Sequence, residues 1–251
     1  MIPRLIARLD IKGSHLIKPV NLEGVRKVGD PKTFSLDYYK QGIDEIIYHD
    51  AVASLYNRIN LNELVRETVK DIFVPLTVSG GIRSISDVEM MLNSGADKVA
   101  INTAAIAKPE IINQVASTFG SQCMVLSIEA KSKPGGDGWE AYTNGGREKT
   151  GVDVLDWVKE AVDRGVGEIF LTSVDHEGMQ KGFDTELCKV VSEAVPIPVI
   201  LSGGMGTVSD IVDAINVGKA DAVAIAHMLH YKKISVDELR TGLHEHNILT
   251  R

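Results

Sequence analysis

Short, almost continuously apolar runs alternate with longer amphipathic stretches along the chain. The eight runs are Leu5–Asp10, Glu45–His49, Pro75–Ser79, Lys98–Asn102, Met124–Glu129, Glu168–Thr172, Pro198–Ser202 and Ala222–Ala226. Strands of a parallel sheet are covered on both faces, and they are therefore apolar throughout rather than alternating. The pattern predicts eight buried parallel strands.

The stretches between these runs carry the spacing of helices. Ser86–Ser94, Leu155–Arg164 and Ser209–Val217 have apolar residues at i, i+3 and i+4. Ser86 and Ser209 each precede an aspartate and are predicted to begin their helices. Eight strand–helix units in 251 residues fit one closed (β/α)₈ barrel over residues 1–251. The alternative is an open doubly wound sheet, which more often has a Gly-x-Gly-x-x-Gly turn after its first strand, and none is present.

An internal repeat favours the barrel. The segment TVSGGIRSISDVEMMLNSGADKVAIN from Thr77 resembles ILSGGMGTVSDIVDAINVGKADAVAIA from Ile200, almost half the chain length further on. Two similar halves of four strand–helix units close naturally into a barrel. The long segments Gly13–Pro31 and Lys131–Gly151 follow the first and fifth strands and are predicted to be mobile loops on the catalytic face.

Composition narrows the class of protein. There are 27 basic and 34 acidic residues, a net charge of −7, which argues against a nucleic-acid binder that needs a basic stripe. Cys123 and Cys188 lie in apolar surroundings and are expected to be reduced core thiols, and no Cys/His cluster predicts a metal or cofactor. No run reaches the ~18 apolar residues of a membrane span, and the first ten residues are too charged for a signal peptide. We therefore expect a cytoplasmic protein.

Two Gly-Gly turns occupy equivalent places in the repeat. Ser79-Gly80-Gly81 and Ser202-Gly203-Gly204 follow the third and seventh strands. Glycine lets backbone N–H groups approach an anion closely. With polar residues at other strand ends (Asn102-Thr103, Asp175–Gly178 and His227), the turns predict two phosphate sites across one mouth. The alternative is that the glycines only permit tight turns.

Two carboxylates lie between these turns. Asp10 and Glu129 end the first and fifth strands, and each is followed two residues later by a lysine. Paired carboxylates in a barrel mouth suit general acid–base catalysis, because one can be protonated while the other is not. The alternative is a structural role in ion pairs with lysine. Asp50, at the end of the second strand, is a weaker candidate.

Four charged residues stand at strand starts, at the opposite end of the barrel. They are Arg4, Glu45, Lys98 and Glu168. Charges inside a barrel are costly unless they are paired, so we expect a ring of ion pairs across the bottom. Spacing alone assigns this ring only a role in stability.

Several motifs together resemble the HisF family, the cyclase subunits of imidazole glycerol phosphate synthase. The resemblance covers essentially the whole chain and includes LDIK at Leu9–Lys12, Lys18-Pro-Val-Asn, PLTVSGGIRS, ADKVAIN, the DGWE…GGR segment at Asp137–Arg147 and LTS-x-D at Leu171–Asp175. The related HisA isomerases share the half-barrel repeat but lack the DGWE loop and the four-charge ring.

The resemblance implies a set of roles. A HisH-like glutaminase docks at the bottom of the barrel, and ammonia enters past a gate formed by Arg4, Glu45, Lys98 and Glu168 and travels to the mouth. Asp10 and Glu129 are the catalytic pair. The residues that bind the phosphorylated small-molecule substrate are Lys18, Gly81, Asn102, Thr103, Glu177, Gly178, Ser202, Gly204 and His227.

Some positions depart from the family pattern. Glu129 stands where the family has aspartate, and displacement of a carboxylate by ~1 Å can cost ~10²-fold in rate. His227 replaces a small residue, Arg8 a cysteine, Ser79 a glycine and Glu177 an aspartate. With IARLDIKG, VLSIEAK and VAIAHMLHYK, these changes resemble the paralogues of surface-polysaccharide gene clusters, such as the glycosyl-amidation protein WbuZ.

Three hypotheses follow. The leading one is a barrel that channels ammonia from a HisH-like glutaminase to amidation of a nucleotide sugar in surface-polysaccharide synthesis, with a third protein supplying the amidation chemistry. The second is the cyclase of histidine biosynthesis. The third is a non-catalytic scaffold that docks and activates the glutaminase.

Overall fold

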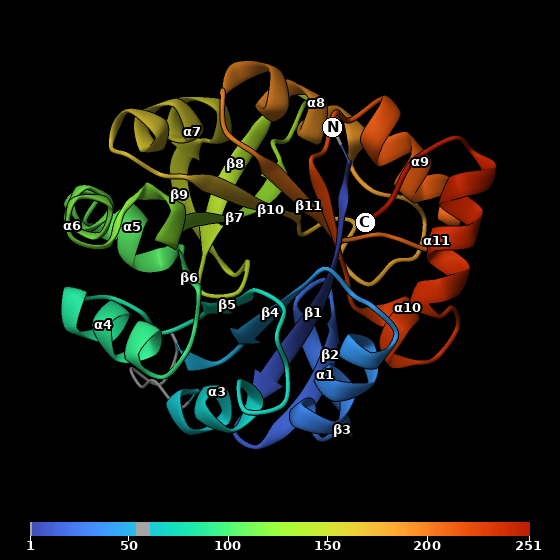
Figure 1. Cartoon of the computed structure of the whole chain (residues 1–251). Coiled ribbons are helices and arrows are strands. Elements are labelled where there is room, and N and C mark those ends of the chain that lie inside the picture. Colours follow the sequence, from blue (N-terminus) through green and yellow to red (C-terminus); the bar gives the residue numbers. More distant parts are fainter. Residues whose placement is uncertain (1, 54–60) are drawn as a thin grey trace.

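The computed structural model describes residues 2–53 and 61–251 and shows a closed barrel (Figure 1). Its parallel strands are β1 (Arg4–Lys12), β4 (Glu45–Asp50), β5 (Leu76–Ser79), β6 (Lys98–Ile101), β7 (Met124–Ser132), β10 (Glu168–Ser173), β11 (Val199–Ser202) and β12 (Ala222–Ile225). Each pairs with the next in this order, and β12 pairs back with β1. The predicted (β/α)₈ barrel is confirmed, and the open-sheet alternative is wrong.

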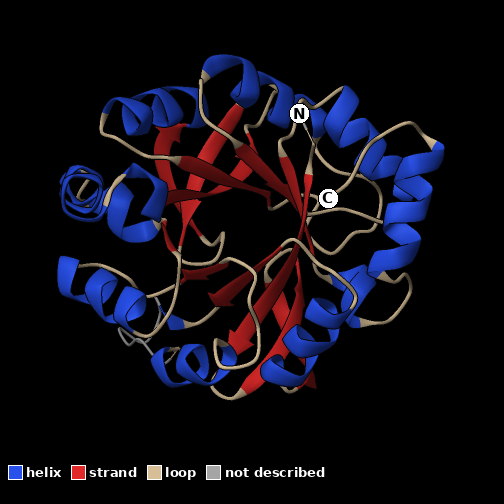
Figure 2. Cartoon of the chain, in the orientation of Figure 1, coloured by secondary structure: helices blue, strands red, loops and turns tan. Residues whose placement is uncertain are grey.

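Helices surround the strands (Figure 2). They are α1 (Pro31–Lys40), α3 (Asn62–Thr68), α4 (Ile85–Asn93), α5 (Thr103–Ala107), α6 (Glu110–Phe119), α7 (Val154–Asp163), α8 (Thr185–Ala194), α9 (Val208–Asn216), α10 (His227–His230) and α11 (Val236–Glu245), with a 3₁₀ turn η1 (Ser121–Cys123). No helix within the described ranges is long and apolar enough to cross a membrane.

Helices α4 and α9 begin one residue before the predicted starts Ser86 and Ser209, and their capping residues lie two residues before them. Ser84 caps α4, because its Oγ accepts a hydrogen bond from the backbone N–H of Asp87 at 3.2 Å. Thr207 caps α9 through a capping box with Asp210. The aspartate in each Ser-Asp pair therefore belongs to the first turn of its helix, where a carboxylate is favourable.

The two segments predicted to be mobile loops are β-hairpins. β2 (His15–Val20) and β3 (Glu23–Gly29) extend from β1, and β8 (Trp139–Thr143) and β9 (Glu148–Asp153) extend from β7. β1 and β7 run beyond the barrel rim, where they pair antiparallel with β2 and β8, respectively. The hairpins occupy equivalent places in the two halves and bring backbone and side chains to the mouth.

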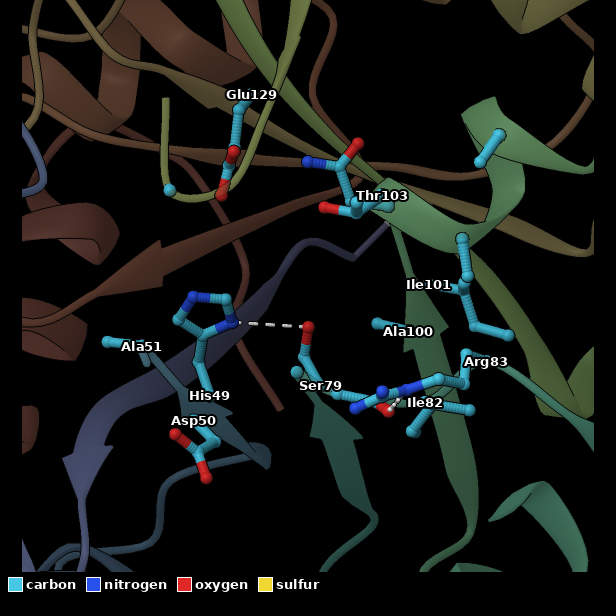
Figure 3. Close-up of a pocket in the computed structure, with 16 residues that line it drawn as sticks. His49, Asp50, Ala51, Ser79, Ile82, Arg83, Ala100, Ile101, Thr103 and Glu129 are labelled. Atoms are coloured by element: carbon cyan, nitrogen blue, oxygen red, sulfur yellow. Dashed lines mark hydrogen bonds between the residues drawn. The ribbon is translucent and has the colours of Figure 1, made fainter. Parts of the chain in front are cut away.

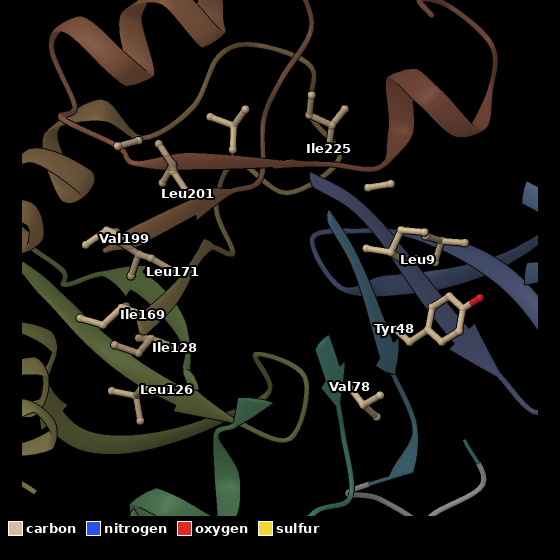
Figure 4. Close-up of a cluster of buried hydrophobic side chains, with 14 of the residues drawn as sticks. Leu9, Tyr48, Val78, Leu126, Ile128, Ile169, Leu171, Val199, Leu201 and Ile225 are labelled. Atoms are coloured by element: carbon tan, nitrogen blue, oxygen red, sulfur yellow. The ribbon is translucent and has the colours of Figure 1, made fainter. Parts of the chain in front are cut away.

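Strand alternation sorts the buried residues into two sets. Side chains such as Leu9 and Leu201 pack between the strands and the helices (Figure 4). A separate cluster fills the barrel interior and contains Ile6, Ile47, Ala100, Val125, Phe170, Ile200, Ala222 and Ala224. On β1 the inward parity places Arg4, Ile6, Arg8 and Asp10 in successive layers. Of the two free cysteines, Cys188 is buried and Cys123 is partly buried.

Candidate active site

The carboxyl ends of the strands place the two candidate catalytic carboxylates in the barrel mouth. Asp10 lies on β1 and Glu129 on β7, and their side chains are 0% and 6% exposed. Both point inward because they share the parity of the interior apolar residues of their strands. The structure therefore brings the predicted pair to the mouth.

Asp10 is surrounded by cations. Arg8 Nε donates to Asp10 Oδ1 at 2.9 Å, and Lys18 Nζ lies 3.5 Å from Oδ2. Burial alone would raise the pKa of Asp10, but the charges of Arg8 and Lys18 outweigh it and hold that pKa well below its ordinary value. Oδ2 accepts no hydrogen bond from the part of the chain that the structure describes. Asp10 is thus ionised at neutral pH and retains acceptor capacity.

Glu129 has the opposite electrostatics. Its burial raises the pKa to about 7, although the backbone N–H of Gly146 donates to Oε2 at 2.8 Å and the charge of Arg8 acts in the other direction. Gly146 lies in the turn between β8 and β9, so the hairpin tip is bonded to this carboxylate. A group with this pKa exchanges a proton readily at neutral pH, while its neighbour stays charged.

The first half-site, formed by the Ser79–Ile82 turn with Asn102 and Thr103, opens into a cavity of about 200 Å³ that reaches Glu129 (Figure 3). His49 Nδ1 and Ser79 Oγ are 3.2 Å apart across it. Asn102 Nδ2 donates to the backbone oxygen of Tyr142 at 3.0 Å, and Asn102 Oδ1 has no partner among the described residues. The predicted ligands Gly81, Asn102 and Thr103 all line this space.

Glycine is required in this turn. Gly80 has a φ of +100°, and a Cβ there would lie 2.5 Å from the backbone oxygen of Asp50. Asp50 itself is buried, lines the same cavity and accepts a hydrogen bond from the backbone N–H of Val52 at 3.1 Å. The strand end and the turn are therefore held in close contact.

The second half-site, formed by the Ser202–Met205 turn with Ala226 and His227, has a cavity of only about 20 Å³. The predicted ligands Lys18, Glu177, Gly178, Ser202, Gly204 and His227 line it. Lys18 Nζ donates to Glu177 Oε1, and Arg8 Nη1 lies 3.7 Å from Glu177 Oε2. The repeat thus places two equivalent half-sites at one mouth, but they differ greatly in free space.

Arg8 is a residue of the mouth that the sequence identifies only as a departure from the family pattern, and its contacts could not be predicted. It is 2% exposed, stands over the Phe170 ring at 5.5 Å, and donates to Thr172 and Ser202 at 3.3 and 3.1 Å. Its parity on β1, shared with Asp10, is the signal that points it inward. The sequence likewise did not identify His49 as a residue of the site. Among residues 2–53 and 61–251, no group of His, Cys, Asp and Glu could hold a metal ion.

The four charges at the strand starts form a ring at the opposite end of the barrel. Arg4 bonds Glu45 at 2.7 Å and Glu168 at 2.6 Å. Lys98 bonds the same two carboxylates at 3.2 and 2.8 Å. Each cation therefore bridges both anions, and the interior apolar cluster separates this ring from the mouth.

Comparison with known proteins identifies relatives over nearly the whole chain. A family model described as "Histidine biosynthesis protein" matches residues 4–235. A Legionella pneumophila protein named "Imidazole glycerol phosphate synthase subunit HisF" is 58% identical over 207 residues, 82% of this chain and 97% of that protein. Proteins of the same name from Lactococcus lactis subsp. cremoris, strains SK11 and MG1363, are 44% and 43% identical over 248 residues, 99% of this chain and 96% of theirs.

Proposed function

The chain belongs to the HisF family of imidazole glycerol phosphate synthase subunits, and on this premise we propose that it is the cyclase subunit of that synthase. It would combine ammonia with the phosphoribulosyl intermediate and release imidazole glycerol phosphate and the aminoimidazole carboxamide ribotide. The names of the relatives favour the second of the three hypotheses drawn from the sequence, the cyclase of histidine biosynthesis. The first hypothesis, polysaccharide amidation with a third protein, finds no support in them.

The unequal carboxylates carry this proposal. Glu129, with a pKa raised to about 7, is the group that would give and take a proton at neutral pH. Asp10 would stay ionised and accept a hydrogen bond from the substrate through Oδ2. The first half-site would hold a phosphate with Gly81, Asn102 and Thr103, beside Glu129. The proposed roles of Glu129 and Asp10 follow from the position and charge of each carboxylate in the mouth.

A HisH-type glutaminase is the proposed partner, docked at the face that holds the ring of Arg4, Glu45, Lys98 and Glu168. Ammonia would pass this ring and then the interior cluster. Arg8 leans toward β10 and β11, where it bonds Thr172 and Ser202. Ala100, on β6, belongs to the interior cluster and also lines the open cavity. We therefore place the passage along Ala100, and we expect the complex to work in the cytoplasm.

Complementation tests the cyclase assignment. We expect the chain, expressed in a histidine auxotroph that lacks only its cyclase and supplied with ammonium, to restore growth without histidine. An immunoblot of the soluble fraction controls for expression. Absence of growth from the soluble wild-type protein, with growth restored by Glu129→Asp, would contradict the assignment and support the polysaccharide hypothesis.

A variant of the ring tests the passage of ammonia. Lys98→Ala is expected to lower the glutamine-dependent reaction of the complex severalfold and to leave the reaction with added ammonium salt unchanged, because the ring lies far from the carboxylates. Lys108→Ala removes an exposed lysine and is the control. Equal glutamine-dependent rates in the variant and the wild type, with the glutaminase still bound, would instead favour the scaffold hypothesis.

A further inference from the structure

The two half-sites have equivalent turns, yet one is open and the other is nearly filled. The first offers about 200 Å³ and the second about 20 Å³. A single water needs ~10–15 Å³ of free space. The second half-site thus has room for little more than one water, and a phosphate cannot enter it as it stands.

Glu177 lines the second half-site, and its carboxylate lies against the Gly203 turn. A Cβ on Gly203 would lie 2.8 Å from the backbone oxygen of Ser173 and 3.2 Å from Glu177 Oε2. In the first half-site, the Gly80 turn packs in the same way on the backbone of Asp50, and the three atoms nearest to it all belong to that backbone. The two turns therefore have the same backbone contact, and a carboxylate oxygen lies against the second.

The charges around Glu177 are balanced. Arg8 and Lys18 contribute two positive charges, and Asp10 and Glu177 contribute two negative ones, all within ion-pair distance and all less than 4% exposed. An incoming anion therefore meets cations that are already neutralised. Without the charge of Glu177, the same cluster would carry one net positive charge.

We propose that the Glu177 carboxylate occupies the place of a ligand anion in the second half-site. The protein then binds one phosphoryl group at the first half-site and accepts a second only after Glu177 leaves Lys18. The buried Nδ1 of His227, which has no hydrogen-bond partner among the described residues, becomes available to that second group. The inference rests on the proposed function for the identity of the substrate, whereas phosphate binding itself does not depend on turnover.

The number of bound phosphates tests the proposal. Inorganic phosphate is titrated into the full chain and followed by calorimetry and ³¹P NMR. We expect the wild type to bind one equivalent of phosphate and Glu177→Gln to bind a second. The second site of the variant should bind phosphate at least about tenfold more tightly than the second site of the wild type, because the Glu177 carboxylate and a phosphate are like charges and their contact is strongly unfavourable. Asn102→Ala should remove the wild-type equivalent, and the double variant Asn102→Ala/Glu177→Gln should keep the second.

The control is Glu193→Gln, which removes the same charge from an exposed position near the end of α8 and should leave one equivalent. Two equal equivalents in the wild type, or no second equivalent in folded Glu177→Gln, would overturn the proposal. If Glu177→Gln does not fold, Glu177→Asp retracts the carboxylate while keeping its charge. Partial gain of the second site is then expected, and no gain overturns the proposal. If the chain fails to complement the auxotroph but the phosphate stoichiometries are as expected, the cyclase assignment is rejected and the proposal on Glu177 stands.

Discussion

Replacement of Arg8 by methionine is expected to lower the free energy of unfolding by about 3–5 kcal/mol, the cost of removing one partner from a buried ion pair. Arg8 is 2% exposed and lies beside two buried carboxylates, Asp10 and Glu177. In the variant, Lys18 alone would have to balance both of them. Methionine keeps much of the side-chain length, so the loss reports mainly on charge. Urea unfolding at pH 7 measures it.

Two further variants isolate the cause. Arg164→Met breaks an ion pair with Glu160 at the surface, where the N–O distance is 2.8 Å, and should cost under about 1 kcal/mol. The double variant Arg8→Met/Asp10→Asn removes a stranded carboxylate as well, so it should be more stable than the sum of its single changes suggests. A loss below about 1 kcal/mol for Arg8→Met would show that Arg8 does not hold the carboxylates in place.

The barrel could be predicted because its determinants are local. Each parallel strand is buried on both faces, which leaves an apolar run that can be recognised without knowing its neighbours. The hairpins could not be predicted in this way. Residues 148–150 of β9 are partly or fully exposed, and the segments are rich in glycine and polar residues. β2 and β8 become strands by pairing with the extended ends of β1 and β7, and β3 and β9 pair in turn with β2 and β8. These strands therefore depend on contacts between segments and not on an apolar run of their own.

The site was predictable as a set of positions but not as a set of contacts. Asp10, Glu129 and the Gly-Gly turns end predicted strands, so their presence at one mouth follows from the fold. The sequence repeat suggests two similar phosphate sites. The difference between them depends on the direction of the Glu177 side chain and on the reach of Lys18 from the hairpin, and both are set by long-range packing.

The stability of the protein is expected to depend on pH through Glu129. Burial raises the pKa of this group from 4.5 to about 7, a difference that corresponds to about 3 kcal/mol. We expect the wild type to lose that amount relative to Glu129→Gln between about pH 4.5 and pH 8. Urea unfolding of both proteins across this range measures the difference, and the kcat profile of the variant should lack the wild-type ionisation near pH 7.

The sign follows from where the proton is held. The folded state keeps the Glu129 proton up to a higher pH than the unfolded state does, so this stabilisation is complete below pH 4.5 and lost as the pH rises through 7. His49 acts in the opposite direction, because burial lowers its pKa from 6.5 to about 4 and its stabilisation is lost as the pH falls. The same holds for His230, with a pKa lowered to about 3. Both histidines are present in the variant, so their contributions cancel in the difference. A difference between the two proteins that stays constant with pH would mean that Glu129 is ionised in the folded state and cannot act as the proton donor.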